Sequence, residues 1–151
     1  MATDDRFPCN GHHPVFAKPH NQEIWVMLLE KCWAKVYGSY QAIGSGSSKE
    51  GFMALTGAPC EVVSQKENKE EIIRTLHNAH KNRYVATMSG STYLESLGKA
   101  GEEKLGLVSE HAYSLLKVLK TENEILLKIR NPWGKTVWKG DWSYHSPLWT
   151  P

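Results

Sequence analysis

The chain has 151 residues, with 18 Lys and Arg against 16 Asp and Glu and a formal net charge of +2. Because 40% of the residues are hydrophobic and 23% are charged, we predict a single globular domain over residues 1–151. The basic residues are dispersed, which argues against nucleic acid as a partner, and no apolar run approaches the roughly 20 residues that span a bilayer.

The three cysteines, Cys9, Cys32 and Cys60, are odd in number and show no CxxC spacing. This pattern argues against a disulfide framework and against a zinc site. The N-terminus lacks the basic and apolar regions of a signal peptide. We therefore expect reduced thiols and a cytoplasmic location.

The first predicted helix lies within residues 21–40, where apolar residues recur at spacings of three and four. Asn21 is expected to cap this helix and Gly38 to end it. A second, shorter helix is predicted over residues 49–57, with Ser47 and Glu50 as a capping box and Gly57 as the stop. The apolar stripe of the first helix comprises Trp25, Leu28, Leu29, Cys32, Trp33 and Val36.

The middle of the chain predicts one helix and one strand. Residues 67–82 alternate charged and apolar residues, which puts Ile72, Ile73 and Leu76 on one helical face. Residues 83–90 have the composition of a strand. Residues 91–110 are rich in Gly, Ser and Glu, and we expect a surface excursion there.

The last third predicts a β-hairpin, since the strand-like runs 111–119 and 124–131 are separated by four polar residues. If the strands pair about a centre near Thr121, His111 lies directly opposite Asn131 on the same face. Tyr113, Leu115 and Leu119 would share the face of His111, with Ile125, Leu127 and Ile129 on the facing strand.

A carboxamide that accepts a hydrogen bond from an imidazole N–H fixes which ring nitrogen stays free. The free nitrogen can then act as general base towards a thiol or a hydroxyl. The predicted pair of His111 and Asn131 is therefore a candidate for part of a catalytic triad.

Several segments resemble the calpain-type cysteine proteases, which belong to the papain-like clan. "HAYSLLKV" at 111–118 and "KIRNPWG" at 128–134 are similar to the family's His and Asn segments. "PVFAK", "EIWVMLLEKCWAKVYGSYQAI", "GFMALTGAP" and "VWKGDWSYHSPLW" follow the family's order, and "TDDRFPC" resembles the start of its second catalytic subdomain. The likeness covers most of the chain outside residues 61–106.

The resemblance implies an α+β fold in which helices flank an antiparallel β-sheet, as in the second half of a papain-like cysteine protease. It implies that His111 is the general base, that Asn131 orients it, and that Trp133 covers the pair in the cleft. It also implies a longer protein that hydrolyses peptide bonds of protein substrates, with a cysteine-bearing catalytic subdomain as the partner of this one.

The family's nucleophile lies in a motif resembling Q-G-x-x-x-D-C-W at the start of a helix, and nothing in this chain matches that motif. Cys32 lies mid-helix between Leu28 and Val36, away from the helix N-terminus that would lower the pKa of a thiol. We therefore expect the isolated chain to be inactive.

We expect no metal or cofactor in this chain. Val137 and Tyr144 stand where calcium-dependent calpains have acidic residues, and Asp141 alone does not restore a calcium site, although calcium remains open for the complete enzyme. His77 and His80 are spaced for a metal, but no third ligand is near them in the sequence, and a solvated helix face is the favoured interpretation.

Two departures from the family favour a different function. Glu110 stands where the family has Gly before the catalytic His, and the acidic positions are missing at Val137 and Tyr144. The alternative is therefore a non-catalytic calpain-like module that serves protein interaction or regulation. Transglutaminase-like or deubiquitinating chemistry is a more distant alternative, because HAY together with NPWG points to calpains.

Overall fold

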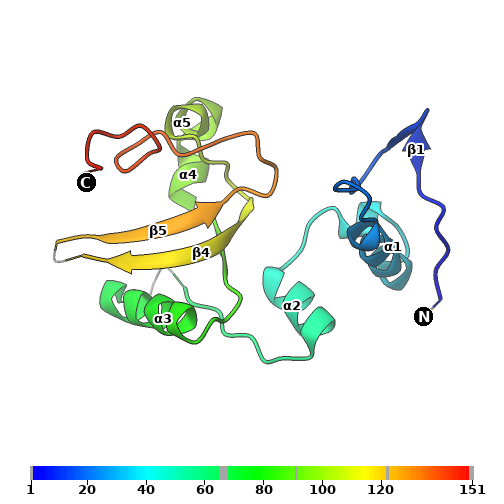
Figure 1. Cartoon of the computed structure of the whole chain (residues 1–151), viewed down its shortest axis with the longest axis horizontal. Coiled ribbons are helices and arrows are strands. Elements are labelled where there is room, and N and C mark those ends of the chain that lie inside the picture. Colours follow the sequence, from blue (N-terminus) through cyan, green and yellow to red (C-terminus); the bar gives the residue numbers. More distant parts are fainter. Residues whose placement is uncertain (1, 65–67, 91, 122, 150–151) are drawn as a thin grey trace. The chain divides into compact units, whose positions relative to one another are not determined.

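The computed structural model describes residues 2–64, 68–90, 92–121 and 123–149, and these residues form two compact units, Met1–Pro59 and Cys60–Pro151 (Figure 1). The composition gave no sign of this division, and the single domain over residues 1–151 stays a prediction. The first residues of two predicted segments, positions 67 and 91, lie outside the described residues.

The first unit contains a two-stranded antiparallel ribbon and two α-helices. Strands β1 (Cys9–Asn10) and β2 (His13–Pro14) pair around a turn at Gly11. Helix α1 runs over Trp25–Tyr37 and ends at Gly38 with φ of 93°, which confirms the predicted stop. The predicted cap is wrong: α1 begins after Ile24, and Asn21 lies outside the helix with φ of 55°.

The buried face of α1 differs from its apolar stripe. Met27, Lys31 and Ala34 are the buried residues, whereas Trp25 is 60% and Val36 61% exposed. The N-terminal segment explains this burial, because the Lys31 ammonium donates to the Asp4 carboxylate and to backbone carbonyls of residues 4 and 6. The hydrogen bond and charge of Lys31 lower the pKa of Asp4 from 3.8 to about 2.

A short 3₁₀ helix, η1 (Gln41–Ile43), leads to helix α2 (Ser48–Thr56), which ends at Gly57 as predicted. The predicted capping box is not formed. The side chain of Ser47 makes no cap hydrogen bond, and the carboxylate of Glu50 instead accepts from the Tyr37 hydroxyl. The tertiary partner on α1 therefore replaces the local backbone contact that the sequence pattern predicted.

The second unit is built on a three-stranded antiparallel sheet in the order β3-β4-β5. Helix α3 (Lys69–Lys81) precedes β3 (Thr87–Ser89), and the carboxamide of Asn68 caps α3 by accepting from the backbone N–H of Glu70. The helix and the strand confirm the predicted elements, and Ile72, Ile73 and Leu76 are all half-buried. With these helices and antiparallel sheets, the predicted α+β class is confirmed.

The predicted surface excursion at 91–110 is wrong in part, because it contains two helices. They are α4 (Thr92–Ser96) and α5 (Gly98–Leu105), and Leu94 of α4 is buried with 5% exposure. The Gly and Ser content that suggested a loop marks the helix ends instead: Gly98 starts α5, and Gly106 ends it with φ of 72°.

The predicted hairpin is present, but its register is wrong. Strands β4 (Ala112–Lys120) and β5 (Ile125–Arg130) pair Lys120 with Ile125, so the centre lies beyond Thr121. A bulge between Leu115 and Lys117 then shifts the pairing by one residue. As a result Leu115 faces Ile129, and Val118, not Leu119, is buried beyond the bulge.

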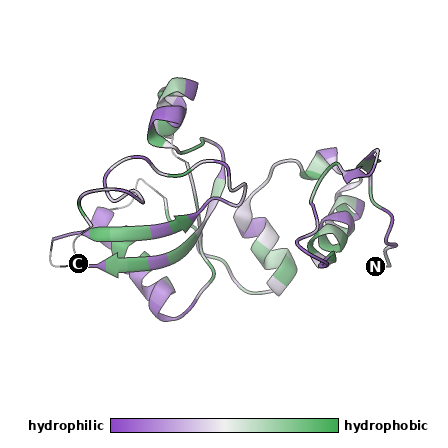
Figure 2. Cartoon of the chain, turned by 45° about the horizontal axis from the view of Figure 1, so that its top comes forward, coloured by the Kyte–Doolittle hydropathy of each residue, from purple (hydrophilic) through white to green (hydrophobic). Residues whose placement is uncertain are grey.

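Helices cover both sides of the hairpin, with α3 on one side and α4 and α5 on the other (Figure 1). The strands are hydrophobic over most of their length and α3 is largely hydrophilic (Figure 2). Among the residues that the structure describes in this unit, the buried hydrophobic ones are Tyr113, Val118 and Leu94. Two of these three residues lie on β4, the central strand of the sheet.

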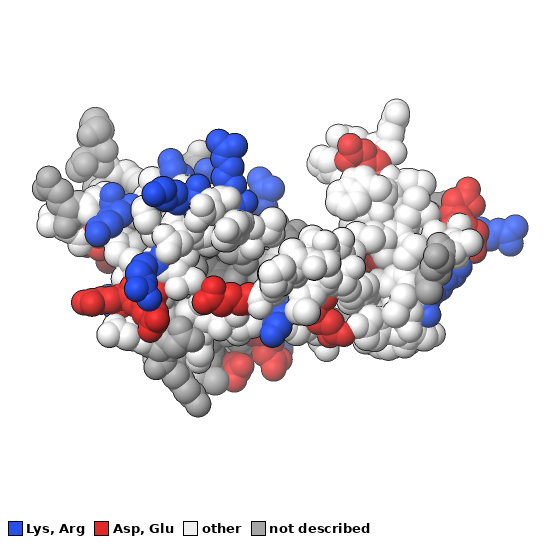
Figure 3. Space-filling view, turned by 90° about the horizontal axis from the view of Figure 1, so that it is seen from below, with Lys and Arg blue, Asp and Glu red and all other residues white. Residues whose placement is uncertain are grey.

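Charged side chains of both signs lie on the surface, and Figure 3 shows Lys and Arg gathered along one edge of the second unit. Lys117 and Lys128 are direct neighbours across β4 and β5, an arrangement in which like charges repel. Within the described ranges no helix has the length and the apolar character needed to cross a bilayer.

Candidate active site

The segment before β4 is held in place by the end of α5. The carboxylate of Glu102 accepts hydrogen bonds from the backbone N–H of Ser109, at 2.6 Å, and from the Ser109 hydroxyl. These two bonds lower the pKa of Glu102 below its ordinary value, because they stabilise the carboxylate. Glu110 then takes a positive φ of 47°, and this left-handed residue directs the chain into β4.

His111 directly precedes β4 and is buried, with 7% exposure. Its imidazole ring meets the Tyr113 ring edge-on with 4.9 Å between the centroids. The hydroxyl of Tyr113 accepts from the backbone N–H of Val108 at 2.7 Å, so that both ends of the Tyr113 side chain are fixed. One side of the imidazole therefore packs against the ring of Tyr113, a residue of β4 whose side chain is fixed at both ends.

Asn131 follows β5 and opens the turn Asn-Pro-Trp-Gly. The backbone N–H of Gly134 donates to the carbonyl of Asn131 at 3.1 Å, and Gly134 has φ of 64°, which favours glycine. The backbone N–H of Trp133 donates to Oδ1 of Asn131 at 3.0 Å. An Asn side chain commonly bonds the backbone two residues on in this way, so the local sequence itself orients the carboxamide.

Nε2 of His111 lies 2.8 Å from Oδ1 of Asn131. Since a carbonyl oxygen only accepts, the neutral imidazole carries its proton on Nε2 and leaves Nδ1 with a free lone pair. The predicted contact is thus present although the predicted register is not. It forms because Asn131 lies beyond the end of β5, where the turn brings its side chain back to His111.

Trp133 contacts the same imidazole, as predicted. The ring centroids of His111 and Trp133 lie 4.0 Å apart with planes at 39°, and the indole remains 62% exposed. The structure therefore brings the three predicted site residues together. An aromatic ring over the pair excludes water from one side of the hydrogen bond and strengthens it.

Sequence reasoning missed two residues that support this site. The carboxamide nitrogen of Asn131 donates to the Thr136 hydroxyl at 2.7 Å. Gly106 lies against the backbone of the same loop, and a Cβ at this position would overlap the carbonyl of Val137. The ends of α5 and of this loop are also joined by the backbone N–H of Lys139, which donates to Leu105 at 2.9 Å. No sequence pattern pairs residue 106 with residue 137.

The imidazole of His111 contacts the side chains of Asn131, Tyr113 and Trp133 in the described part of the chain, and none of these three side chains is a thiol. Cys32 lies within α1, as expected, and is half-buried. The side-chain contacts around His111 thus comprise one carboxamide and two aromatic rings.

Val137 and Tyr144 occupy the two positions where the resemblance implied acidic residues, and the absence of a calcium site stays a prediction. Val137 is 70% and Tyr144 89% exposed, and neither side chain offers a carboxylate. No group of three or more His, Cys, Asp or Glu residues that could hold a metal occurs in the described part of the chain. This includes His77 and His80 on α3.

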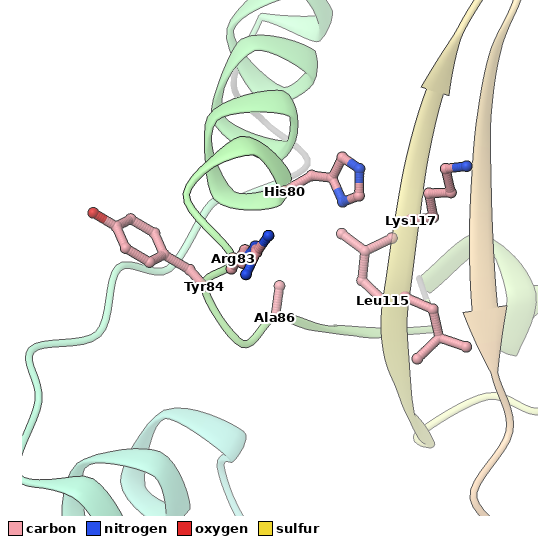
Figure 4. Close-up of a pocket in the computed structure, with 7 residues that line it drawn as sticks. His80, Arg83, Tyr84, Ala86, Leu115 and Lys117 are labelled. Atoms are coloured by element: carbon pink, nitrogen blue, oxygen red, sulfur yellow. The ribbon is translucent and has the colours of Figure 1, made fainter.

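A separate hollow of about 260 Å³ lies between the end of α3 and β4 (Figure 4). His80 and Leu115 point towards one another across it, whereas Tyr84 points away. Its lining contains none of the three site residues. His80 is therefore a histidine of the same unit that lies outside the candidate active site.

In a comparison with sequence models of protein families, the calpain family of cysteine proteases matches residues 1–151. The chain belongs to the calpain family. It is 36% identical to human calpain-14 over 158 residues and 32% identical to mouse calpain-12 over 154 residues. It is also 33% identical over 161 residues to the calpain-type cysteine protease DEK1 of Zea mays.

These matches cover 99% of this calpain-family chain in each case. In the other direction the chain spans 21% of mouse calpain-12, 22% of human calpain-14 and 7% of the maize protein. It thus corresponds to a fraction of each relative's length.

Replacing Glu110 with Gly is expected to stabilise the second unit by about 1 kcal/mol, because an L-residue in the left-handed region carries roughly 1–2 kcal/mol of strain that glycine lacks. Urea denaturation measures the change. Glu110→Ala is the matched control, since it removes the carboxylate and keeps the strained backbone. If Glu110→Gly is no more stable than Glu110→Ala, the strain at position 110 is absent and this account is contradicted.

Proposed function

We propose that this chain supplies the His and Asn of the active site of an intracellular cysteine endopeptidase. In the complete enzyme a cysteine-bearing subdomain of the same family supplies the nucleophile, and protein substrates bind between the two. The chain alone is proposed to be inactive. The cytoplasmic location is part of the proposal and is supported by the free thiols of Cys9 and Cys32.

The single observation that carries this proposal is the contact of 2.8 Å between Nε2 of His111 and Oδ1 of Asn131. It supports a proton-accepting role for Nδ1, the nitrogen that the carboxamide does not engage. A general base must present one ring nitrogen in a fixed direction, and a hydrogen bond to the other ring nitrogen provides that orientation.

In the proposed reaction Nδ1 of His111 takes the proton of the partner's thiol, and the sulfur bonds to the carbonyl carbon of the substrate while the C=O π bond breaks and its electron pair moves to the oxygen. Collapse of the tetrahedral intermediate breaks the C–N bond, and the imidazolium returns the proton to the leaving amine. Water then attacks the thioester with Nδ1 as base, which releases the acid product and the thiol. In these steps the imidazole of this chain carries the protons, and the partner subdomain's thiol and a water molecule are the two nucleophiles.

A second function is supported by Glu110. Its positive φ places strain directly before His111, at a position where glycine would carry none. A chain that has accepted such a residue is also compatible with a non-catalytic module that binds other proteins. The intact contacts among His111, Asn131 and Trp133 favour the catalytic proposal over this one.

Turnover of a fluorogenic peptide separates the two functions. The isolated chain is expected to show no turnover, and the chain covalently continued from a polypeptide that carries the family's Gln and Cys motif is expected to hydrolyse the peptide. The control is the same fusion with that cysteine replaced by alanine. An inactive fusion whose second unit is correctly folded would favour the non-catalytic module.

A further inference from the structure

The carboxamide of Asn131 is held by contacts on both of its ends. Its oxygen accepts from the backbone N–H of Trp133 at 3.0 Å and faces His111. Its nitrogen lies 2.7 Å from the Thr136 hydroxyl and 3.4 Å from the Thr136 carbonyl oxygen. Both Asn131 and Thr136 are half-buried.

The backbone contacts and the hydroxyl contact have different effects on the Asn131 carboxamide. A backbone N–H only donates and a backbone carbonyl only accepts, so the Trp133 and Thr136 backbones decide which end of the carboxamide is oxygen. A hydroxyl can do either and cannot decide this. The Thr136 hydroxyl makes the shorter of the two bonds to the nitrogen, and it therefore fixes the position of the carboxamide against the imidazole.

We propose that Thr136 is a positioning residue of this active site, whose hydroxyl holds the Asn131 carboxamide so that its oxygen stays on Nε2 of His111. Without the hydroxyl, the nitrogen keeps only the long bond to the carbonyl. The carboxamide then rotates more freely about its side-chain bonds, and its oxygen spends less time on Nε2 of His111, which weakens the selection of the Nε2–H tautomer. The catalytic consequence rests on the proposed function, whereas the structural effect does not.

The expected result of Thr136→Val, which keeps the shape and removes the hydroxyl, is a fall in the Nε2–H tautomer of His111. The ¹⁵N chemical shifts of the imidazole in the whole 151-residue chain measure it, at a pH where the ring is neutral. The hydrogen exchange of the Asn131 side-chain NH₂ is expected to accelerate about tenfold, the change that loss of one half-buried hydrogen bond produces. Thr136→Ser, which restores a hydroxyl, is expected to return both signals towards those of the native chain.

Thr121→Val is the matched control, because the Thr121 hydroxyl accepts from the backbone N–H of Glu124 in the hairpin turn. It is expected to leave the His111 signals unchanged. Native-like tautomer and exchange in a folded Thr136→Val chain would overturn the proposal, as would equal effects of Val and Ser. If Thr136→Val does not fold, Thr136→Ala, which also removes the hydroxyl, is compared with Thr136→Ser. Altered His111 signals in Ala and native signals in Ser support the positioning role, and equal signals in the two variants contradict it. If the Thr136 variants change the His111 signals as expected but the fusion enzyme with native Thr136 is inactive, the proposed function is contradicted and the positioning role of Thr136 is not.

Discussion

Replacing His111 with alanine in the active fusion enzyme is expected to lower kcat/KM by about 10³-fold or more, because general base and general acid catalysis are lost together. The cavity left by the buried ring also removes the contacts of Trp133 and Tyr113. Initial rates with a fluorogenic peptide measure the effect, and circular dichroism checks that the variant is folded.

His80→Ala is the matched control for this variant. His80 is a half-buried histidine of the same unit, lies on α3, and is apart from the candidate site (Figure 4). It is expected to change kcat/KM by less than about twofold, within the usual small effect of substitutions away from a site. Comparable losses in the two variants would mean that His111 acts through the fold and not as the base.

Gly106→Ala is expected to destabilise the second unit by about 3 kcal/mol, the largest effect on stability among the substitutions considered. Its φ of 72° puts an L-residue under roughly 1–2 kcal/mol of strain, and overlap of the new methyl with the Val137 carbonyl adds about 1–3 kcal/mol. Urea denaturation followed by tryptophan fluorescence measures the loss, which is large against the stability of a small domain.

Gly98→Ala separates the two contributions, because Gly98 has φ of 61° and a methyl group at this position would point into open space. It is expected to lose only the strain energy, about 1–2 kcal/mol. If Gly106→Ala and Gly98→Ala lose the same free energy, the close approach between α5 and the loop after β5 does not exist in solution.

The sequence predicted the pair of His111 and Asn131 by reasoning that was partly wrong. Alternating apolar residues correctly predicted the two strands, but the loop between β4 and β5 and the bulge after Leu115 changed the register that placed the two residues opposite each other. A bulge has no reliable pattern in a single sequence. The pair forms through a turn whose Asn-Pro-Trp-Gly sequence was recognised only for its family likeness.

The helices followed local signals where no tertiary contact competed. Gly38 and Gly57 end helices as predicted because left-handed backbone at a helix end favours glycine. Ser47 with Glu50 failed as a capping box because Tyr37, 13 residues from Glu50, takes its carboxylate. Thr136 and Gly106 were missed for the same reason, since their roles depend on contacts between segments that no local pattern reports.

The measurement that tests the central claim most directly is the alkylation rate of the nucleophilic cysteine by iodoacetamide at neutral pH, in the fusion with native His111 and in the fusion with His111→Ala. A thiol next to an imidazole that can take its proton is more often a thiolate and reacts faster. The account predicts rapid alkylation with native His111 and a rate near that of a simple thiol with His111→Ala. Equal rates in the two folded proteins would contradict the claim that this chain supplies the base of the active site.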